Sequence, residues 1–181
     1  MNRQELHITV KKAFGNLYRK KCVLIAVQDA GDKILIGAKP YFYPPTIARL
    51  LGGGVDEHEN LEQAIVRELQ EELGVTIKPS SLAPLVLFAT HATDEDGNKL
   101  HNETYVYHTN IGSQKFQAGD DVKHIIKLTV NELYQLGEKY EGLSDSLWYN
   151  GPEGMFSWAD YAKMYGPVHK IAAEAIRDLD R

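Results

Sequence analysis

The chain is poor in cysteine, in long apolar runs and in excess positive charge. Cys22 is the single cysteine among 181 residues, so no internal disulfide can form, and its apolar surroundings favour a buried structural thiol. No apolar run approaches the roughly 20 residues that a membrane helix requires. The polar residues 1–5 lack the apolar segment of a secretory signal peptide. A cytoplasmic protein that makes no membrane contact is therefore expected.

Negative charge exceeds positive charge, and the formal net charge is -5. A protein that holds a long nucleic acid usually carries a basic surface. We therefore expect no nucleic acid polymer among the partners of this chain. A small nucleotide-like substrate is compatible with the charge, because a bound metal ion can supply positive charge locally.

The length and the order of the expected elements favour one α/β domain over residues 1–181. Its core is expected at about 18–139, between an N-terminal strand at 6–14 and a C-terminal helical extension at about 141–181. Periodicity and turn signals predict strands at 21–28, 33–38, 48–51, 82–91, 103–110 and 125–128, and a further strand that starts at 75–77. They predict helices at 60–73, 130–139 and 157–181, and the last of these is expected to break near 166–167. Strands that surround helices without regular alternation indicate a mixed sheet with helices on both faces.

The helix at 60–73 carries acids in an unusual position. Asn60, with Gln63 three residues later, predicts its N-terminal cap, and Gly74 predicts its C-terminal cap. On a helical wheel of about 100° per residue, Glu68 and Glu72 fall inside the apolar arc formed by Leu61, Ala64, Ile65, Leu69 and Leu73.

Two carboxylates on a sheltered helix face repel each other, and they are costly to bury unless they are paired or bind a cation. Arg67 is one cation facing several glutamates, so pairing alone does not balance the charge. Glutamate oxygens suit Mg²⁺ or Mn²⁺. The pattern therefore indicates a divalent metal site, although a helix whose acids reach solvent at the edge of the core explains the same pattern.

Three glycines, Gly52-Gly53-Gly54, precede this helix. Such a run lets a ligand approach the backbone closely, although it is more typical of a plain tight turn. Gly53, Glu59 and the segment Arg67-Glu68-Leu69-Gln70-Glu71-Glu72-Leu73-Gly74-Val75 have the spacing of a complete Nudix box. On these residues the chain resembles the Nudix hydrolase (MutT-like) family.

The resemblance implies a Nudix-type α/β/α sandwich with a mixed sheet, in which the box forms a loop-helix-loop. It also implies a pyrophosphohydrolase that acts on phosphorus-containing acid anhydrides with Mg²⁺ or Mn²⁺. By position, the metal ligands that it implies are the carbonyl of Gly53 and the carboxylates of Glu68, Glu71 and Glu72. Arg67 and Glu59 are expected to pair and to hold the helix acids in place.

The proton acceptor in such a reaction is either a box glutamate or an acid from a later loop. The later acids here are Asp120 and Asp121 and, more weakly, Glu103. Asp120-Asp121 follows Gly119, which is also typical of a simple polar turn.

The substrate is set by loops outside the box. The aromatic loop Tyr41-Phe42-Tyr43 offers rings on which a base can stack, although aromatic residues in turns more often cover the core. Residues 88–91 stand where ADP-ribose-specific members of the family carry a proline. The resemblance therefore predicts a nucleoside diphosphate derivative without identifying it.

Two other functions are compatible with this scaffold. A nucleotide-sensing module would bind without cutting, but such modules normally have an eroded box or an added output domain. An isopentenyl-type isomerase would use a cysteine, whereas Cys22 lies in an expected core strand well before the box. A homodimer is also expected, because the strand at 6–14 precedes the family core and needs an apolar partner.

Overall fold

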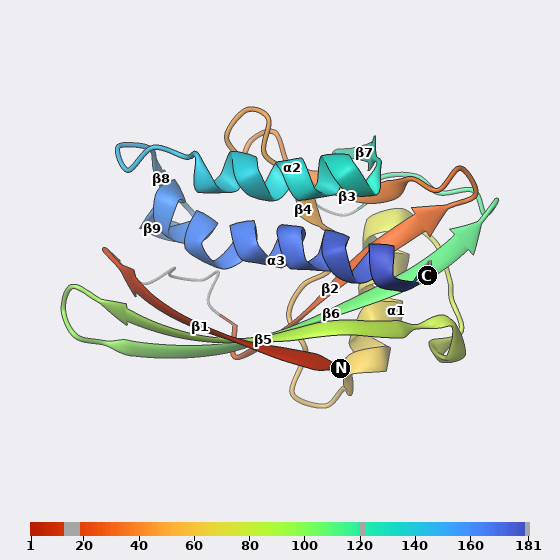
Figure 1. The fold of residues 1–181 in the computed structure, drawn as a ribbon, viewed down its shortest axis with the longest axis horizontal. Helices are drawn as coiled ribbons and strands as arrows, with labels where there is room; N and C mark the ends of the chain where they lie inside the picture. Colours follow the sequence, from red (N-terminus) through yellow and green to blue (C-terminus); the bar gives the residue numbers. More distant parts are fainter. Residues whose placement is uncertain (13–18, 120–121, 180–181) are drawn as a thin grey trace.

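The computed structural model describes residues 1–12, 19–119 and 122–179. A mixed sheet forms the middle layer of the protein (Figure 1). Within the described residues its strands are β1 (Asn2–Val10), β2 (Lys21–Asp29), β3 (Ile34–Ala38), β4 (Arg49–Leu50), β5 (Ala83–Asp94), β6 (Lys99–Gly112) and β7 (His124–Leu128). The remaining elements are α1 (Leu61–Leu73), the short helix η2 (Pro79–Ser81), α2 (Val130–Glu141), the hairpin β8 (Trp148–Gly151) and β9 (Gly154–Ser157), and α3 (Trp158–Leu179).

The sheet has the order β1-β5-β6-β2-β3-β4, and β7 pairs with β3. The β1–β5 and β2–β6 pairs are parallel, whereas β2–β3, β3–β4, β3–β7 and β5–β6 are antiparallel. The expected mixed sheet is confirmed.

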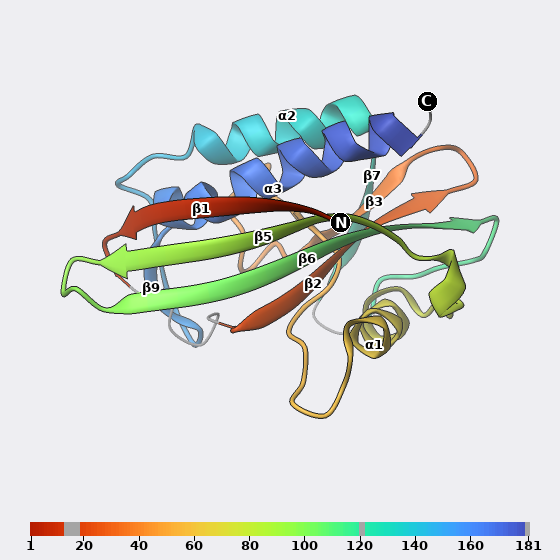
Figure 2. The ribbon, with the colours of Figure 1, turned by 60° about the horizontal axis from the view of Figure 1, so that its bottom comes forward.

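Strand β2 carries apolar side chains on both faces because both faces of the sheet are covered. Val23, Ile25 and Val27 pack in one cluster with the apolar residues of α1. Leu24 and Ala26 belong to a second cluster, which contains the buried residues of α2 and α3. Figure 2 shows the three layers, with α2 and α3 above the sheet and α1 below it. The expected α/β/α sandwich is confirmed.

Helix α1 begins and ends as its caps predict. The Asn60 side chain accepts from Gln63 N–H, and the Gln63 side chain accepts from Asn60 N–H, both at 2.9 Å. Gly74 takes the left-handed conformation, with φ of 67°, and ends the helix. The apolar residues of α1 that pack in the cluster with β2 fix which helix face meets the sheet, and Glu68 and Glu72 are buried on that face.

Three expectations differ from the structure, and one hairpin of the structure was not predicted. Strand β1 begins at Asn2 and ends at Val10, and residues 13–14 of the expected strand lie outside the described residues. Residues 75–77 form no strand, although Val75 and Ile77 are buried against α1. The β8–β9 hairpin was not predicted. The C-terminal helix continues through Pro167.

The continuity of α3 has a packing reason. A Cβ at Gly137 of α2 would lie 2.7 Å from the carbonyl oxygen of Gly166 in α3, so the two helices touch closely where both lack side chains. Buried residues run along both halves of α3, and this packing keeps the helix continuous across the proline despite the lost backbone hydrogen bond.

Strand β1 finds its partner within its own chain. It pairs along its whole length with β5, and Val10, Leu6 and Ile8 pack against the core on the α3 side. The apolar partner for which a homodimer was expected is therefore intramolecular. None of the described helices is long and apolar enough to cross a membrane.

Candidate active site

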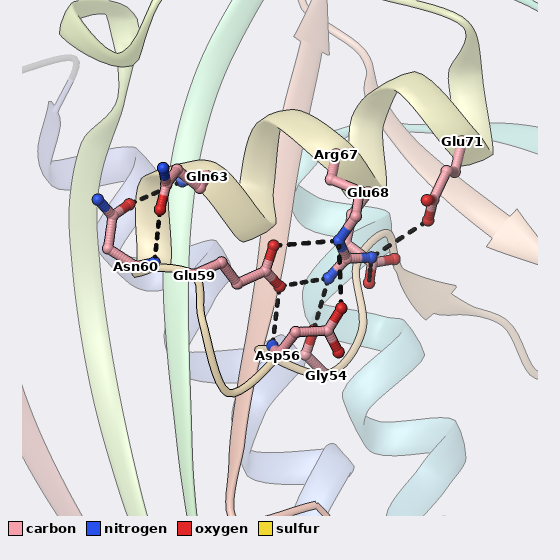
Figure 3. Close-up of polar contacts among 8 residues, drawn as sticks. All are labelled: Gly54, Asp56, Glu59, Asn60, Gln63, Arg67, Glu68 and Glu71. Atoms are coloured by element: carbon pink, nitrogen blue, oxygen red, sulfur yellow. Dashed lines mark hydrogen bonds and ion pairs between the residues drawn. The ribbon is translucent and has the colours of Figure 1, made fainter.

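One arginine ties the box together. Arg67 donates from Nε and Nη2 to the two carboxylate oxygens of Glu59 at 3.1 and 2.6 Å. Its Nη2 also donates to the Gly54 carbonyl at 2.9 Å. Its Nη1 donates to Glu68 Oε1 at 2.8 Å and to Glu71 Oε2 at 3.2 Å. Figure 3 shows these bonds converging on the guanidinium from the loop and from the helix.

Glu59 joins the loop before α1 to this arginine. Its Oε1 also accepts from Asp56 N–H at 2.8 Å. The hydrogen bonds from Arg67 lower the pKa of Glu59 below its usual value because they stabilise the carboxylate. The expected Arg67–Glu59 pair is therefore present, and it orients the side chains of Glu68 and Glu71.

Two carboxylates of the box are buried on the same helix face. Glu68 is 9% and Glu72 4% exposed. Burial raises the pKa of Glu68, and it raises the pKa of Glu72 to about 7, since charge is disfavoured away from water. Glu72 Oε2 accepts from Gly52 N–H at 2.7 Å, but no cation among the described residues forms an ion pair with it. The acids do not simply reach solvent at the edge of the core.

Gly52 and Gly53 bring the backbone against these acids. Gly52 has φ of 121°, and a Cβ there would collide with the carbonyl oxygen of Val23, so glycine is required. A Cβ on Gly53 would lie 2.6 Å from Glu68 Oε1. The Gly53 carbonyl accepts from Val23 N–H at 2.9 Å and retains a second lone pair. The run thus provides both a tight turn and a close approach.

The residues expected as metal ligands suit a divalent cation. Gly53, Glu68, Glu71 and Glu72 all line one cavity. Carboxylate and carbonyl oxygens are the donors that Mg²⁺ and Mn²⁺ prefer. A divalent cation would also compensate the buried charge of Glu72, which forms no ion pair within the described residues.

The cavity has a volume of about 610 Å³, a size typical of small-molecule sites. Its wall combines the box acids with basic and aromatic side chains. The basic residues are Arg19, Lys39, Arg49 and Lys123, and the aromatic ones are Tyr41, Phe42, Tyr43, Tyr149, Tyr161 and Tyr165. A site with acids, cations and aromatic rings suits a ligand that combines phosphates with a ring system.

The residues of the aromatic loop differ in exposure. Tyr43 is 6% exposed and belongs to the core. Phe42 packs edge to face against Tyr43 and Tyr149, with ring centroids 4.8 and 5.0 Å apart. Tyr41 is 95% exposed and lines the cavity. Phe42 and Tyr43 therefore mainly cover the core, and Tyr41 presents an exposed ring.

Other expected site residues are placed differently. Glu103 lies on β6, where it accepts from the Tyr105 hydroxyl at 2.9 Å, and it does not line the cavity. Asp120 and Asp121 lie outside the described residues. The residue before them, Gly119, donates its N–H to the Glu72 carbonyl at 3.1 Å, so this loop meets the C-terminal end of α1.

Sequence reasoning missed Arg49 and the aromatic residues of the C-terminal extension. Arg49 donates to the Gly52 carbonyl at 2.7 Å, and its guanidinium carbon lies 5.6 Å from the Tyr165 ring centroid. The one feature of the sequence that could have indicated Arg49 is its charge within the otherwise apolar strand predicted at 48–51. Cys22 is buried as expected, and burial raises the pKa of its thiol, but it also lines the cavity.

The α/β/α sandwich of this chain, with its acid-bearing loop-helix-loop, is the architecture of a Nudix protein. The NUDIX domain family matches residues 18–147, and the chain belongs to this family. Tyr149, Tyr161 and Tyr165 lie beyond the matched residues and still line the cavity.

Two curated relatives match parts of the chain. An ADP-ribose pyrophosphatase of Methanocaldococcus jannaschii is 32% identical over 104 residues, which cover 56% of this chain and 59% of that protein. The NAD-capped RNA hydrolase NudC of Stutzerimonas stutzeri is 38% identical over 56 residues, 31% of this chain and 20% of that protein. The chain thus spans less than two thirds of either relative.

A solved structure shares the fold over most of the chain. A C. elegans Ap4A hydrolase aligns with a TM-score of 0.52 and 16% identity, covering 87% of this chain and 98% of that one. This likeness extends the shared fold beyond the box.

Proposed function

We propose that this protein is a metal-dependent hydrolase that cleaves a diphosphate linkage in a nucleoside diphosphate derivative. The observation that carries the proposal is the pair of buried acids, Glu68 and Glu72, in the wall of a cavity that also holds basic and aromatic side chains. Such buried acids are expensive unless a cation compensates them. A purely structural helix has no need to place them there.

Some residues of the box would bind the metal ion, and others hold these ligands in position. Glu68, Glu72, Glu71 and the Gly53 carbonyl would hold Mg²⁺ or Mn²⁺. Such a cation would neutralise phosphate oxygens and lower the pKa of a coordinated water. Arg67, fixed by Glu59, keeps the carboxylates of Glu68 and Glu71 in place. A 1 Å misplacement of such groups costs on the order of 100-fold in rate, so the positioning matters.

The proton of the attacking water goes to a carboxylate that faces the cavity. Glu68 and Glu71 both line the cavity, so either carboxylate is placed to accept it. Asp120 or Asp121 is the alternative acceptor. The pH–rate profiles of Glu68→Gln, Glu71→Gln and the Asp120/Asp121 variants identify the acceptor. The variant that lacks the proton acceptor should lose the fall in rate at low pH that protonation of this carboxylate causes.

The rest of the cavity suits a nucleotide. Lys39, Arg49 and Lys123 provide positive charge for phosphates, and Tyr41 offers a ring for stacking on a base. The names of the relatives refer to hydrolases of ADP-ribose, NAD-capped RNA and Ap4A. These names support a nucleotide substrate, and they differ too much to identify one.

A nucleotide panel tests the proposal. The full chain is incubated with nucleoside diphosphate sugars, dinucleotides and nucleoside triphosphates in Mg²⁺, and phosphorus NMR detects the products. We expect cleavage of at least one compound, and none in excess chelator. Binding of a nucleotide without cleavage would favour a sensing module, and isomerisation of isopentenyl diphosphate, included as a control, would favour an isomerase. A homodimer remains a proposal that light scattering tests.

A further inference from the structure

Three histidines form a row across three neighbouring strands, away from the box. In the sheet register, His7 of β1 lies opposite His91 of β5, and His91 lies opposite His101 of β6. Neighbouring strands are about 4.8 Å apart, so register partners on one face have adjacent side chains. Glu5 lies two residues before His7 and therefore points to the same face.

The side chains in this row already touch. The rings of His7 and His91 stack with centroids 4.9 Å apart, and those of His91 and His101 lie 4.7 Å apart. His91 Nε2 lies 3.0 Å from Glu5 Oε2. One potential ligand atom from each of Glu5, His7 and His91 lies within 4.8 Å of the others.

We propose that Glu5, His7 and His91 form a second metal site, for a transition-metal dication of the Zn²⁺ type. Imidazole nitrogens are borderline ligands that suit Zn²⁺, unlike the all-oxygen set of the box, which suits Mg²⁺ or Mn²⁺. A tetrahedral ion with bonds of about 2.0–2.1 Å needs ligand atoms about 3.4 Å apart. Because these side chains are exposed, rotation about their side-chain bonds closes the gap.

Neighbouring residues orient the carboxylate of this site. Arg3 Nε donates to Glu5 Oε1 at 2.7 Å, which leaves Oε2 directed at His91. Hydrogen bonds of this kind commonly fix a metal-binding carboxylate from its far side. The site would clip the N-terminal strand β1 to β5, because its ligands come from both strands. In Figure 2, β1 runs along the edge of the sheet away from α1.

The proposal does not depend on hydrolysis. None of Glu5, His7, His91 and His101 lines the cavity that holds the box acids. The expected Zn²⁺ affinity therefore survives changes that disable the box. This separates the two proposals experimentally.

Zn²⁺ binding to the full chain is measured by competition with a chromophoric chelator, in millimolar Mg²⁺ so that the box is occupied. We expect one Zn²⁺ site whose affinity falls at least about tenfold in His91→Gln. Loss of an outer-sphere partner alone commonly costs about tenfold, so loss of a direct ligand should cost at least as much. His7→Gln, on the edge strand, provides a second variant if His91→Gln folds poorly. His124→Gln, which removes an exposed histidine on β7, is the matched control and should bind as the unaltered chain does.

A second readout is thermal. Zn²⁺ should raise the melting temperature of the unaltered chain, of His124→Gln and of the box variant Glu72→Gln, but not of His91→Gln, because a ligand stabilises only the fold that binds it. Equal Zn²⁺ affinity in His91→Gln, His7→Gln and His124→Gln would overturn the proposal. So would loss of Zn²⁺ binding in Glu72→Gln, because the ion would then occupy the box.

Discussion

Replacing Glu72 with glutamine separates a metal ligand from a structural acid. The Glu72 side chain accepts from Gly52 N–H at 2.7 Å and is almost fully buried. Glutamine keeps the size of the side chain and an oxygen acceptor for Gly52. It removes the charge, so it removes the attraction for a divalent cation.

The magnitude follows from the raised pKa of Glu72. Its pKa is about 7 in the folded protein against 4.5 for the ordinary group. One pKa unit corresponds to about 1.4 kcal/mol, so ionising Glu72 in the metal-free fold costs on the order of 3 kcal/mol. The folded state binds the proton more tightly than the unfolded state does. The cost is therefore absent below pH 4.5, grows as the pH rises, and is complete above pH 7.

Urea unfolding in chelator at low and at mildly alkaline pH measures this cost. At the higher pH, the metal-free Glu72→Gln protein should be more stable than the unaltered chain by up to about 3 kcal/mol. At low pH the difference should vanish. Added Mg²⁺ should stabilise the unaltered chain and leave Glu72→Gln nearly unchanged.

Turnover completes the test of Glu72. The variant should lose orders of magnitude in rate, because the metal contributes several kcal/mol to the transition state. A destabilised Glu72→Gln protein that retains near-normal turnover would refute the reasoning, since that is the behaviour of a structural acid.

Other substitutions test the rest of the site. Gly53→Ala places a methyl group 2.6 Å from Glu68 Oε1 and should weaken Mg²⁺ binding in a calorimetric titration while the protein stays folded. In Arg67→Lys, the lysine cannot reach Glu59, Glu68 and Gly54 together. Turnover in steady-state kinetics should therefore fall on the order of 100-fold, and the free energy of unfolding in urea should fall by about 2 kcal/mol. Tyr41→Ala should raise KM more than it changes kcat if the exposed ring stacks on the substrate. Glu103→Gln should leave turnover unchanged, because the carboxylate does not line the cavity.

The box was predictable because its determinants are local in sequence. The cap at Asn60, the helical period and the left-handed residue at Gly74 all lie within one short segment. The wheel therefore placed Glu68 and Glu72 on the buried face correctly. The pairing of Arg67 with Glu59 is likewise a contact between residues close in sequence.

The cavity wall was not predictable because its residues are far apart in sequence and follow no shared period. Arg49 reaches the box through a short strand, and Tyr165 reaches it from a helix beyond the family match. The strand predicted at 75–77 does not form, again because of contacts that the local sequence does not show. Its apolar residues are buried against α1 and need no partner in the sheet. Pro167 does not break α3 because packing against α2 outweighs the local preference.

The most direct test of the account is phosphorus NMR of a nucleotide panel with the full chain, in Mg²⁺ and in excess chelator. We expect at least one nucleoside diphosphate derivative to lose its diphosphate signal and to yield two phosphate-bearing products, with Mg²⁺ only. Cleavage that persists in chelator, or tight nucleotide binding with every diphosphate left intact, would contradict it.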